Sequence, residues 1–209
     1  MTQKPLIVDF IVEIPSGSHI KYEFDKELKM LRCDRILHTS MSYPGNYGYI
    51  DGTLSNDGDP IDVLMVSDYS ILPMTLVKVK IIGVLMMIDE KGQDEKLIAV
   101  PASCIDPYYD EVNDITDLPK HLLVKVKHFF EHYKDTEPKK WVKVKDYSGR
   151  NVAEKLYNEA KNRVGKLSSI MEEDFEDFEE DFEDFEEELG KSGKALMEKT
   201  LMELGLVNF

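Results

Sequence analysis

The sequence predicts a mainly β protein of the α+β class, in which helices pack against an antiparallel sheet or a small barrel. Short segments rich in β-branched residues follow one another closely over the first two-thirds of the chain, and several alternate apolar with polar residues. Turn-forming residues separate these segments, and no helical pattern intervenes. Because closely spaced strands pair with their neighbours, they favour a meander or a barrel.

Six segments are predicted to be strands, and the stretches between them to be turns or loops. The predicted strands are residues 6–14, 20–24, 29–37, 61–66, 75–88 and 96–100. The predicted turns and loops are "PSGS", "YPGNYG", "SNDGDP" and "DEKGQD", which are rich in residues that suit reversing backbone.

Helical spacing begins after "DITDLPK". Apolar residues recur every three or four positions from Leu122 onward, with Asp117 as the expected N-cap. A short strand is expected over residues 140–145, and a second helix from about Asn151. The main domain is therefore expected to occupy residues 1–167.

Composition and charge narrow the class of function. The chain has 209 residues, of which 42% are hydrophobic, enough to bury one sizeable core. Its formal net charge of -15 argues against a general electrostatic affinity for nucleic acid or an anionic membrane. Thirteen acidic and no basic residues lie between Glu172 and Glu188, and without them the net charge is -2.

The N-terminal stretch and the cysteines indicate the compartment. Residues 1–15 lack a basic region followed by a long apolar stretch and a cleavage site, and the apolar run 81–88 is too short to span a bilayer. Cys33 and Cys104 lie in or beside apolar segments, so buried, reduced side chains are expected rather than a disulfide. These features predict a cytoplasmic protein that does not enter the membrane.

Residues 168–209 are expected to form a second region of a different kind. Within the acidic run, five apolar side chains are spaced 3-4-3-4 in a heptad-type seam, namely Phe175, Phe178, Phe182, Phe185 and Leu189. Like charges four residues apart oppose such a helix unless a basic partner faces it. The region is therefore either a helix that docks on its own subunits or on a basic partner, or a solvated, partly disordered tail.

The stretch "DGDPIDVL" places three carboxylates, Asp57, Asp59 and Asp62, directly before an apolar run. At about 4 Å each like-charged pair costs on the order of 4 kcal/mol at an effective dielectric near 20, so a positive group is expected among them. Three interpretations are open. They are a polar surface turn, a calcium loop of the EF-hand kind, which Pro60 makes a poor match, and a site for several magnesium ions that bound substrate completes.

A second acidic turn strengthens the magnesium interpretation. The stretch "DEKGQDEK" places Asp89, Glu90 and Asp94 around Gly92, with Lys96 just beyond. If the flanking strands belong to one barrel, the two turns meet at one mouth and pool their carboxylates. Such a pool of hard oxygen ligands suits magnesium.

Cationic and phenolic side chains provide the other half of a polyphosphate site. They come from "IKYE", "DRIL", "SYPGNYGYI" and the end of the first helix, and they comprise Lys21, Arg35, Tyr43, Tyr47, Tyr49, Tyr133 and Lys134. Each one singly has an ordinary explanation as a solvated cation or a packed ring with a wet tip. Together they offer the donors that a polyphosphate anion requires.

Two histidines, His128 and His132, lie four residues apart on one face of the predicted helix. A zinc site would require a third ligand, and none is evident in the sequence. A packed or hydrogen-bonded pair is therefore predicted.

The ordered set "VEIP", "IKYE", "CDRIL", "YPGNYGYI", "DGDPIDVL", "DEKGQDEK", "HFFEHYK" and "KWVKV" resembles the soluble family I inorganic pyrophosphatases of the bacterial type, over residues 8–165. The strongest element is "DGDPIDVL", which is similar to the family signature D-x-D-P-x-D. The resemblance implies a five-stranded OB-like barrel with flanking strands and helices, and usually a homohexamer. It also implies magnesium-dependent hydrolysis of pyrophosphate to two phosphates by direct attack of an activated water. Residues 168–209 have no counterpart in the ordinary bacterial pattern.

The resemblance also implies roles for individual residues. Asp57, Asp62 and Asp94 match the principal magnesium ligands, with Asp62 bridging two metals, and Asp89 matches a ligand of a further metal. Asp59 matches the general base that acts on the nucleophilic water. The positions that match substrate-holding groups are Lys21, Arg35, Tyr47, Tyr133 and Lys134. The positions that match supporting site residues are Glu13, Glu23, Tyr43, Asn46, Glu90 and Lys96.

Two other classes of function stay open at this level. An OB-type module for single-stranded nucleic acid requires a basic groove with stacking aromatics, whereas here the aromatic turn is followed by clustered acid. An adaptor whose acidic tail recruits a basic partner is the other. Phosphate release from pyrophosphate, oligonucleotide binding and deletion of residues 168–209 separate the three.

Overall fold

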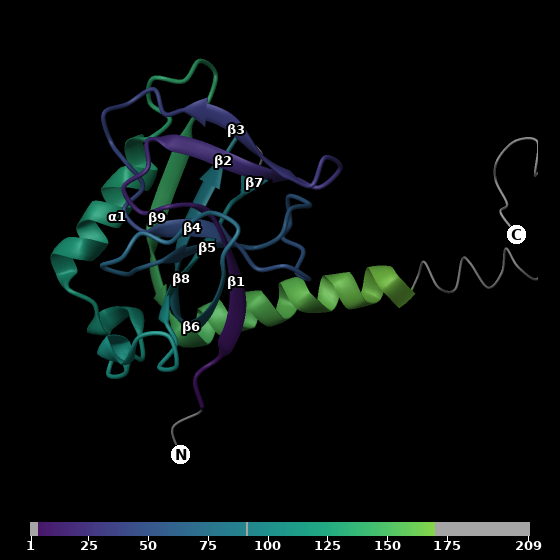
Figure 1. Ribbon diagram of the computed structural model, residues 1–209, viewed down its shortest axis with the longest axis vertical. Coiled ribbons are helices and arrows are strands. Elements are labelled where there is room, and N and C mark those ends of the chain that lie inside the picture. The colour runs from purple at the N-terminus through teal and green to yellow at the C-terminus, as the bar shows by residue number, and fades with distance from the viewer. Residues whose placement is uncertain (1–3, 91, 170–209) are drawn as a thin grey trace, which may run out of the picture. The chain divides into compact units, whose positions relative to one another are not determined.

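The computed structural model describes residues 4–90 and 92–169 (Figure 1). Its elements in chain order are β1 (Ile7–Ile14), β2 (Ile20–Asp25), β3 (Met30–Ile36), β4 (Asn46–Tyr49), β5 (Asp62–Met65), β6 (Leu76–Asp89), β7 (Gly92–Gln93), β8 (Lys96–Pro101), the 3₁₀ helices η1 (Pro107–Tyr109) and η2 (Ile115–Asp117), α1 (Lys120–His132), β9 (Val142–Gly149) and a final helix over 150–169. None of the described helices is both long and apolar enough to cross a membrane.

The chain divides into two compact units, residues 1–164 and 165–209. The fold described here is that of the first unit. The acidic heptad-type seam predicted for the tail lies outside the described residues.

Five strands close into a barrel. They follow one another in the order β1, β4, β5, β8 and β6, and β6 pairs again with β1 to complete the ring. Neighbouring strands are antiparallel except for β5 and β8, which run parallel. The predicted small barrel is confirmed, with one parallel pair that the strand spacing did not indicate. All six residues of β8 are buried, in keeping with its uninterrupted apolar run after Lys96.

Four further strands lie outside this ring. β7 and β9 both pair with β6 and extend the barrel wall. β2 and β3 form an antiparallel hairpin that no strand pairing joins to the barrel within the described residues. Figure 1 shows these two strands side by side at one end of the barrel. The position of the hairpin therefore depends on its loops and on side-chain contacts.

The stretch "YPGNYG", predicted to be a loop, contributes to the barrel strand β4. β4 pairs with β1 on one side and with β5 on the other. A Cβ at Gly48 would lie 2.0 Å from the carbonyl oxygen of Ile11 on β1, so only glycine allows the two backbones to approach this closely. The loop prediction is wrong for residues 46–48, the last three of this stretch, because glycine here permits strand contact rather than a turn.

The two long helices cover different parts of the barrel core. α1 buries Phe129 and Phe130 in one apolar cluster. The final helix buries Ala153 and Tyr157 in the other. Burial of a side chain the size of Phe contributes about 1.5–3 kcal/mol. The predicted helix from about Asn151 is confirmed, and these contacts hold it on the barrel.

Two local predictions are wrong. Asp117 ends η2 and forms a capping box with Asp114, and the residue that precedes α1 is Pro119. Cys33 and Cys104 are free thiols, but both are exposed. Cys33 belongs to β3 of the hairpin, where five of the seven residues are exposed, so its apolar neighbours do not bury it.

The predicted pairing of His128 with His132 is confirmed. Their ring centroids lie 4.7 Å apart with the rings tilted by 52°. The Nδ1 atom of His132 is 2.8 Å from an Oδ2 of Asp135, within hydrogen-bonding distance. Local packing therefore accounts for both rings.

Candidate active site

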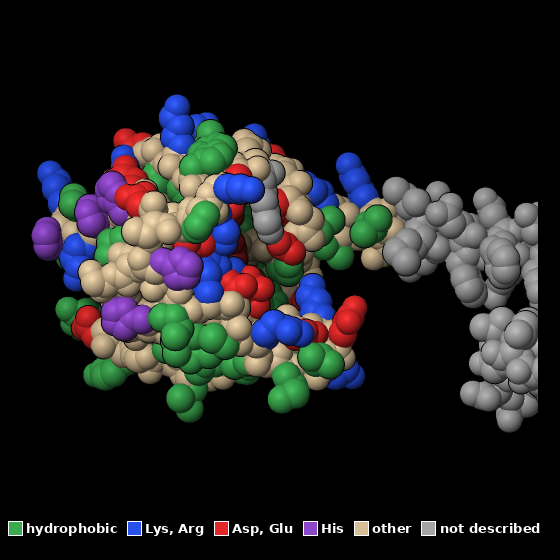
Figure 2. Space-filling model, turned by 90° about the horizontal axis from the view of Figure 1, so that it is seen from above, with side chains coloured by type: hydrophobic (Ala, Val, Ile, Leu, Met, Phe, Trp, Pro, Cys, Tyr) green, Lys and Arg blue, Asp and Glu red, His purple; other side chains and the backbone are tan. Residues whose placement is uncertain are grey.

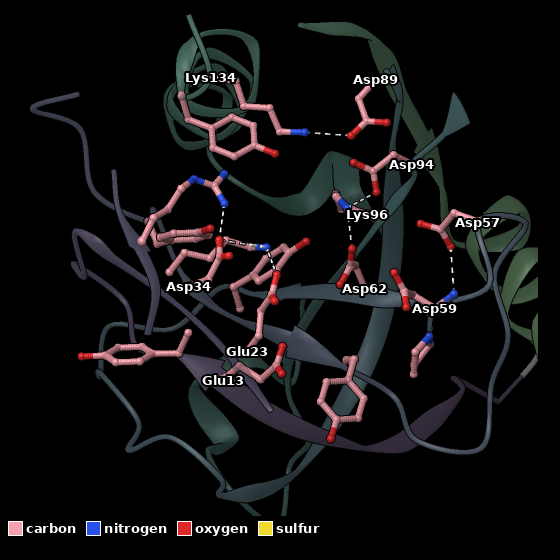
Figure 3. Close-up of a pocket in the computed structure, with 18 of the residues that line it drawn as sticks. Glu13, Glu23, Asp34, Asp57, Asp59, Asp62, Asp89, Asp94, Lys96 and Lys134 are labelled. Carbon is pink, nitrogen blue, oxygen red and sulfur yellow. Dashed lines mark hydrogen bonds and ion pairs between the residues drawn. The ribbon is translucent and has the colours of Figure 1, made fainter. Parts of the chain in front are cut away.

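A cavity of about 470 Å³ is lined jointly by the barrel, the β2–β3 hairpin and the end of α1. Figure 2 shows a hollow on this face in which acidic and basic side chains meet. Five aspartates lie along one side of the cavity in Figure 3, namely Asp57, Asp59, Asp62, Asp89 and Asp94. Every residue predicted for the site lines this cavity except Asn46.

The first acid turn, residues 55–59, is a hydrogen-bonded loop that holds two carboxylates at the rim of the cavity. The Ser55 N–H donates to the carbonyl oxygen of Asp59 at 2.7 Å, and the Asp59 N–H donates to Oδ1 of Asp57 at 3.1 Å. Gly58 between them has φ +91°, a conformation that side chains disfavour. The turn thereby presents Asp57 and Asp59 together, with both side chains exposed to solvent.

Strand register places Asp62 beside Lys96. The two residues are direct partners in the parallel pair of β5 and β8. Lys96 Nζ donates to Oδ2 of Asp62 at 2.5 Å, and it also donates to Asp94. Lys96 is only 2% exposed, and although burial lowers a lysine pKa, the two carboxylates outweigh burial and raise the pKa of Lys96 above its ordinary value. This ammonium is a positive group beside Asp62, one of the three carboxylates among which such a group was expected.

The second acid turn reaches the same mouth because β6 is antiparallel to β8. β6 ends at Asp89, and the Asp94 N–H donates back to the carbonyl oxygen of Met87 at 3.1 Å. Asp89 accepts from Lys134 Nζ at 2.7 Å, and Glu90 lies 3.7 Å from the same atom. The two acid turns, far apart in sequence, thus meet at one mouth of the barrel.

The hairpin supplies a second charged wall. Lys21 on β2 is paired directly with Arg35 on β3. Lys21 donates to Glu23 and lies 3.7 Å from Asp34, which also accepts from Arg35. Two cations and two carboxylates therefore alternate along this wall.

Buried tyrosines lie between the acidic and the basic walls. Tyr47 and Tyr133 come from β4 and the residue after α1, and the ring of Tyr43 packs against Tyr47 with centroids 5.4 Å apart. Burial raises the pKa of all three phenols well above the usual value, and nearby carboxylates add to the shift of Tyr47. Their hydroxyls stay protonated at neutral pH and can donate hydrogen bonds to an anion.

Glu13 joins the hairpin to the barrel. It projects from β1, and its Oε1 accepts from the backbone N–H of Phe24 on β2 at 2.7 Å. Burial raises the pKa of Glu13 to about 7, an effect that the hydrogen bond from Phe24 only partly offsets. Glu13 lines the cavity, but its hydrogen bond serves the position of the hairpin.

Asn46 occupies a structural position. Its Oδ1 accepts from the backbone N–H groups of Ser16 and Ile71, at 3.1 and 2.8 Å, and its Nδ2 donates to the carbonyl oxygen of Tyr69 at 2.9 Å. The side chain is fully buried and joins three backbone segments. Its place in "YPGNYGYI" did not distinguish this use from a place in the cavity.

Sequence reasoning did not single out three further charged residues that line the cavity, Lys26, Asp34 and Lys140. Asp34 directly precedes Arg35, so the alternation of strand side chains places it on the opposite face from Arg35 unless a bulge intervenes. The β2–β3 register does shift near this point, between Lys21 and Tyr22. Lys140 sits in a lysine-rich stretch whose composition carries no positional signal.

The donor set fits magnesium. The five aspartates offer hard carboxylate oxygens, and magnesium takes one or two of these together with water and substrate phosphates. Among the described residues, no three His, Cys, Asp or Glu side chains lie close enough to hold a metal ion by themselves. Lys96 and Lys134 lie among the carboxylates instead, where their ammonium groups offset the repulsion.

The fold and the site together define a class of protein. It is a closed barrel whose mouth sets a row of aspartates against cations and phenols, an arrangement suited to a small, highly charged anion with its metal ions. The family model described as inorganic pyrophosphatase matches residues 10–165. The chain belongs to the inorganic pyrophosphatase family.

Individual relatives agree over most of their length. The inorganic pyrophosphatase of Sulfolobus acidocaldarius is 48% identical over 160 residues, which are 77% of this chain and 88% of that protein. The Helicobacter pylori protein of the same name is 51% identical over 150 residues, 72% of this chain and 87% of that one.

Solved structures agree as well. The Helicobacter pylori inorganic pyrophosphatase structure is 45% identical with a TM-score of 0.75, covering 79% of this chain and 99% of that one. The Thermus thermophilus structure is 41% identical with a TM-score of 0.74, covering 79% and 95%.

Proposed function

We propose that this chain hydrolyses inorganic pyrophosphate to two phosphates, with magnesium ions held by its aspartates. The observation that carries the proposal is the single cavity in which five aspartates face lysines, an arginine and buried phenols. Membership of the inorganic pyrophosphatase family supports the same reaction.

The aspartates on one side of the cavity are proposed as the metal ligands, namely Asp57, Asp62, Asp89 and Asp94. Bound magnesium supplies neutralisation of phosphate charge and a lowered pKa for a water molecule. Asp62 lies between the two acid turns, at the first residue of β5, and so is the carboxylate best placed to serve both. Lys96 balances the charge of Asp62 and Asp94.

The opposite walls are proposed to hold the two phosphoryl groups. Lys21, Arg35 and Lys134 bring positive charge to the cavity from three elements. The protonated hydroxyls of Tyr47 and Tyr133 donate hydrogen bonds to phosphate oxygens. This arrangement stabilises the charge that develops on the leaving phosphate, while Glu23, Tyr43 and Glu90 support it from the surrounding walls.

Asp59 is proposed as the general base. Its carboxylate is exposed at the cavity rim, and the Asx turn with Asp57 fixes its backbone. A carboxylate in this position takes a proton from the attacking water as the water adds to phosphorus. The P–O–P bond then breaks and the second phosphate leaves, so no side chain is covalently modified.

The test is magnesium-dependent phosphate release from pyrophosphate. Asp59→Asn removes the proton acceptor at nearly constant shape, and we expect kcat to fall by at least about 100-fold. Chelation by EDTA is expected to abolish wild-type turnover. Near-normal turnover in Asp59→Asn would exclude Asp59 as the base, and turnover that persists in EDTA would exclude the metal requirement.

Asp51→Asn is the matched control. Asp51 is an exposed aspartate in the preceding turn and does not line the cavity. The same chemical change there is expected to leave kcat within about two-fold, since surface substitutions away from special features change little. A parallel fall in both variants would show a general effect of lost charge.

We also propose that the protein acts in the cytoplasm as a homohexamer, as its family resemblance implies. Light scattering is expected to return six times the chain mass of 24.1 kDa. A monomeric mass at working concentration would exclude this assembly.

A further inference from the structure

A buried carboxylate lies directly behind Arg35 without lining the cavity. Only 3% of the Glu137 side chain is exposed. Arg35 Nε donates to Oε1 of Glu137 at 2.8 Å, and Lys140 Nζ lies 2.8 Å from Oε2. Burial raises the pKa of Glu137, but the hydrogen bonds from Lys140 and Arg35 outweigh burial and hold that pKa below its ordinary value. Glu137 is therefore an anion at neutral pH, and each of its oxygens serves one cation.

Glu137 belongs to the short turn that follows α1. Its N–H donates to the carbonyl oxygen of Lys134 at 2.9 Å, and the Lys140 N–H donates to the carbonyl oxygen of Glu137 at 3.3 Å. In the same turn, the hydroxyl of Thr136 donates to the carbonyl oxygen of His38, just after β3, at 2.5 Å. The turn that carries the cavity residue Lys134 is thus hydrogen-bonded to Arg35 on β3 and to His38 just after β3.

These contacts matter because strand pairing does not place the hairpin. β2 and β3 pair only with each other among the described strands. Glu13 ties β2 to the barrel through the N–H of Phe24, and Glu137 ties β3 to the end of α1 through Arg35. Because no backbone ladder joins the hairpin to the barrel, the distance from Arg35 to Lys134 and the aspartates depends on side-chain bonds such as the one between Arg35 and Glu137.

The guanidinium group makes this tie directional. It is planar, with its donors in a rigid fork, so a bond that holds Nε also sets where the two terminal nitrogens lie. The Arg35 side chain is 16% exposed, and its Nη1 donates to Asp34, which lines the cavity. The half of the fork opposite Glu137 therefore faces the cavity.

We propose that Glu137 is a positioning residue for Arg35, which it orients toward the phosphate-binding side of the cavity. This inference rests on the proposed function, in which Arg35 holds a phosphoryl group. Glu137 contacts no reacting atom. Its effect on turnover passes through Arg35, and a charge-assisted hydrogen bond in a buried place is strong enough to carry it.

The test is a double-mutant cycle that combines Glu137→Gln with Arg35→Gln. Glu137→Gln keeps the size and one acceptor but removes the charge. We expect it to raise the KM for magnesium pyrophosphate and the inhibition constant of inorganic phosphate by about 10-fold, within the range of coupling seen between contacting residues. In the Arg35→Gln background the same change is expected to add less than about two-fold.

Two results would overturn the proposal. One is a KM and a phosphate inhibition constant within about two-fold of wild type in Glu137→Gln. The other is an equal loss in both backgrounds, which a merely structural role predicts. Glu137→Asp retains the charge, and we expect it to recover part of the phosphate affinity; it also serves as the second variant if Glu137→Gln does not fold.

Arg32→Gln is the matched control on the same hairpin. Arg32 is exposed and pairs with Asp25, away from the cavity lining, so we expect KM to stay within about two-fold. The same double-mutant cycle can be measured without turnover, by calorimetric titration of each variant with inorganic phosphate in the presence of magnesium. Failure of wild-type turnover would thus count against the proposed function alone, whereas uncoupled phosphate binding would count against Glu137.

Discussion

Lys96 is a single residue whose positive charge offsets the repulsion between two clustered carboxylates at the mouth of the barrel. Its ammonium is almost out of contact with water and donates to both Asp62 and Asp94. A buried lysine without partners would lose its proton, whereas two carboxylates keep it charged. Removing one partner from such a group is costly, because the other charges are left buried and unpaired.

Glu13 predicts a pH dependence of stability at the residue scale. Its pKa is about 7 in the folded protein, against an ordinary value of 4.5. The folded state therefore binds the proton more tightly, so the stability that Glu13 contributes is complete below pH 4.5 and is lost as pH rises through about 7. In EDTA, we expect Glu13→Gln to match wild type at acid pH and to exceed it in melting temperature above pH 7.

Thermal melts of both proteins from pH 4 to 8.5 measure this difference directly. Glu27→Gln, at an exposed glutamate on the same hairpin, is the control and should track wild type at every pH. A difference between Glu13→Gln and wild type that is constant across the range would contradict the raised pKa.

At the scale of elements, the final helix supports the first acid turn from outside the cavity. The Leu54 N–H donates to the carbonyl oxygen of Ala160 at 3.0 Å, and Arg163 Nη1 donates to the carbonyl oxygen of Leu54 at 2.6 Å. The next residue, Ser55, begins the loop that presents Asp57 and Asp59. A helix distant in sequence therefore holds the base of this loop.

Arg163→Met tests that support. The substitution keeps much of the aliphatic stem but leaves the Leu54 carbonyl without its charged donor, so we expect a loss of about 1–3 kcal/mol in the free energy of unfolding. We also expect a higher magnesium concentration for half-maximal activity, because the loop that carries Asp57 is held less firmly. Denaturant melts and magnesium titrations measure the two effects.

Lys161→Met is the control for the same helix. Lys161 is exposed, so its loss should change stability by no more than about 0.5 kcal/mol. Equal stability and equal magnesium dependence in Arg163→Met and wild type would show that the loop does not depend on this bond.

A second contact links the two acid turns to each other. Asn56 Nδ2 donates to Oε1 of Gln93 at 3.0 Å, which joins the loop before β5 to the short strand β7. Both side chains are exposed, so the bond contributes little to overall stability. It brings together two turns whose own sequences specify only their local shape.

At the scale of the whole molecule, charge is distributed unevenly along the chain. Residues 168–209 contain 15 acidic and three basic residues, whereas every described residue that lines the cavity lies between Glu13 and Lys140. We propose that residues 1–167 are the catalytic domain and that the remainder is accessory to the reaction.

Deletion of residues 168–209 tests this division. We expect kcat and KM to stay within about two-fold of the full chain, because the deletion leaves all the described cavity side chains in place. We also expect the truncated protein to stay hexameric, with a mass six times that of its shortened subunit, and to be retained more weakly on an anion exchanger. A changed number of subunits would assign the acidic region to assembly, and a fall in kcat with the hexamer intact would assign it to regulation.

Much of the fold and of the site could be predicted because the relevant signals are local. Strand alternation and turn composition predicted the barrel, and the closely spaced aspartates of "DGDPIDVL" and "DEKGQDEK" indicated a charged site. The prediction missed strand β4 because its glycine was interpreted from local sequence alone. Gly48 reads as a turn residue in sequence, and only its contact with Ile11 shows that it permits strand approach.

What sequence alone could establish was therefore the chemistry available: carboxylates, cations and phenols on strands and turns of known type. Which of them meet depended on long-range packing. The parallel register of β5 and β8 sets Asp62 beside Lys96, and the turn after α1 carries Glu137 to Arg35 across 102 positions. A contact between residues so far apart is fixed by the closure of the barrel and the seating of its helix, and neither has a signature in the neighbouring residues.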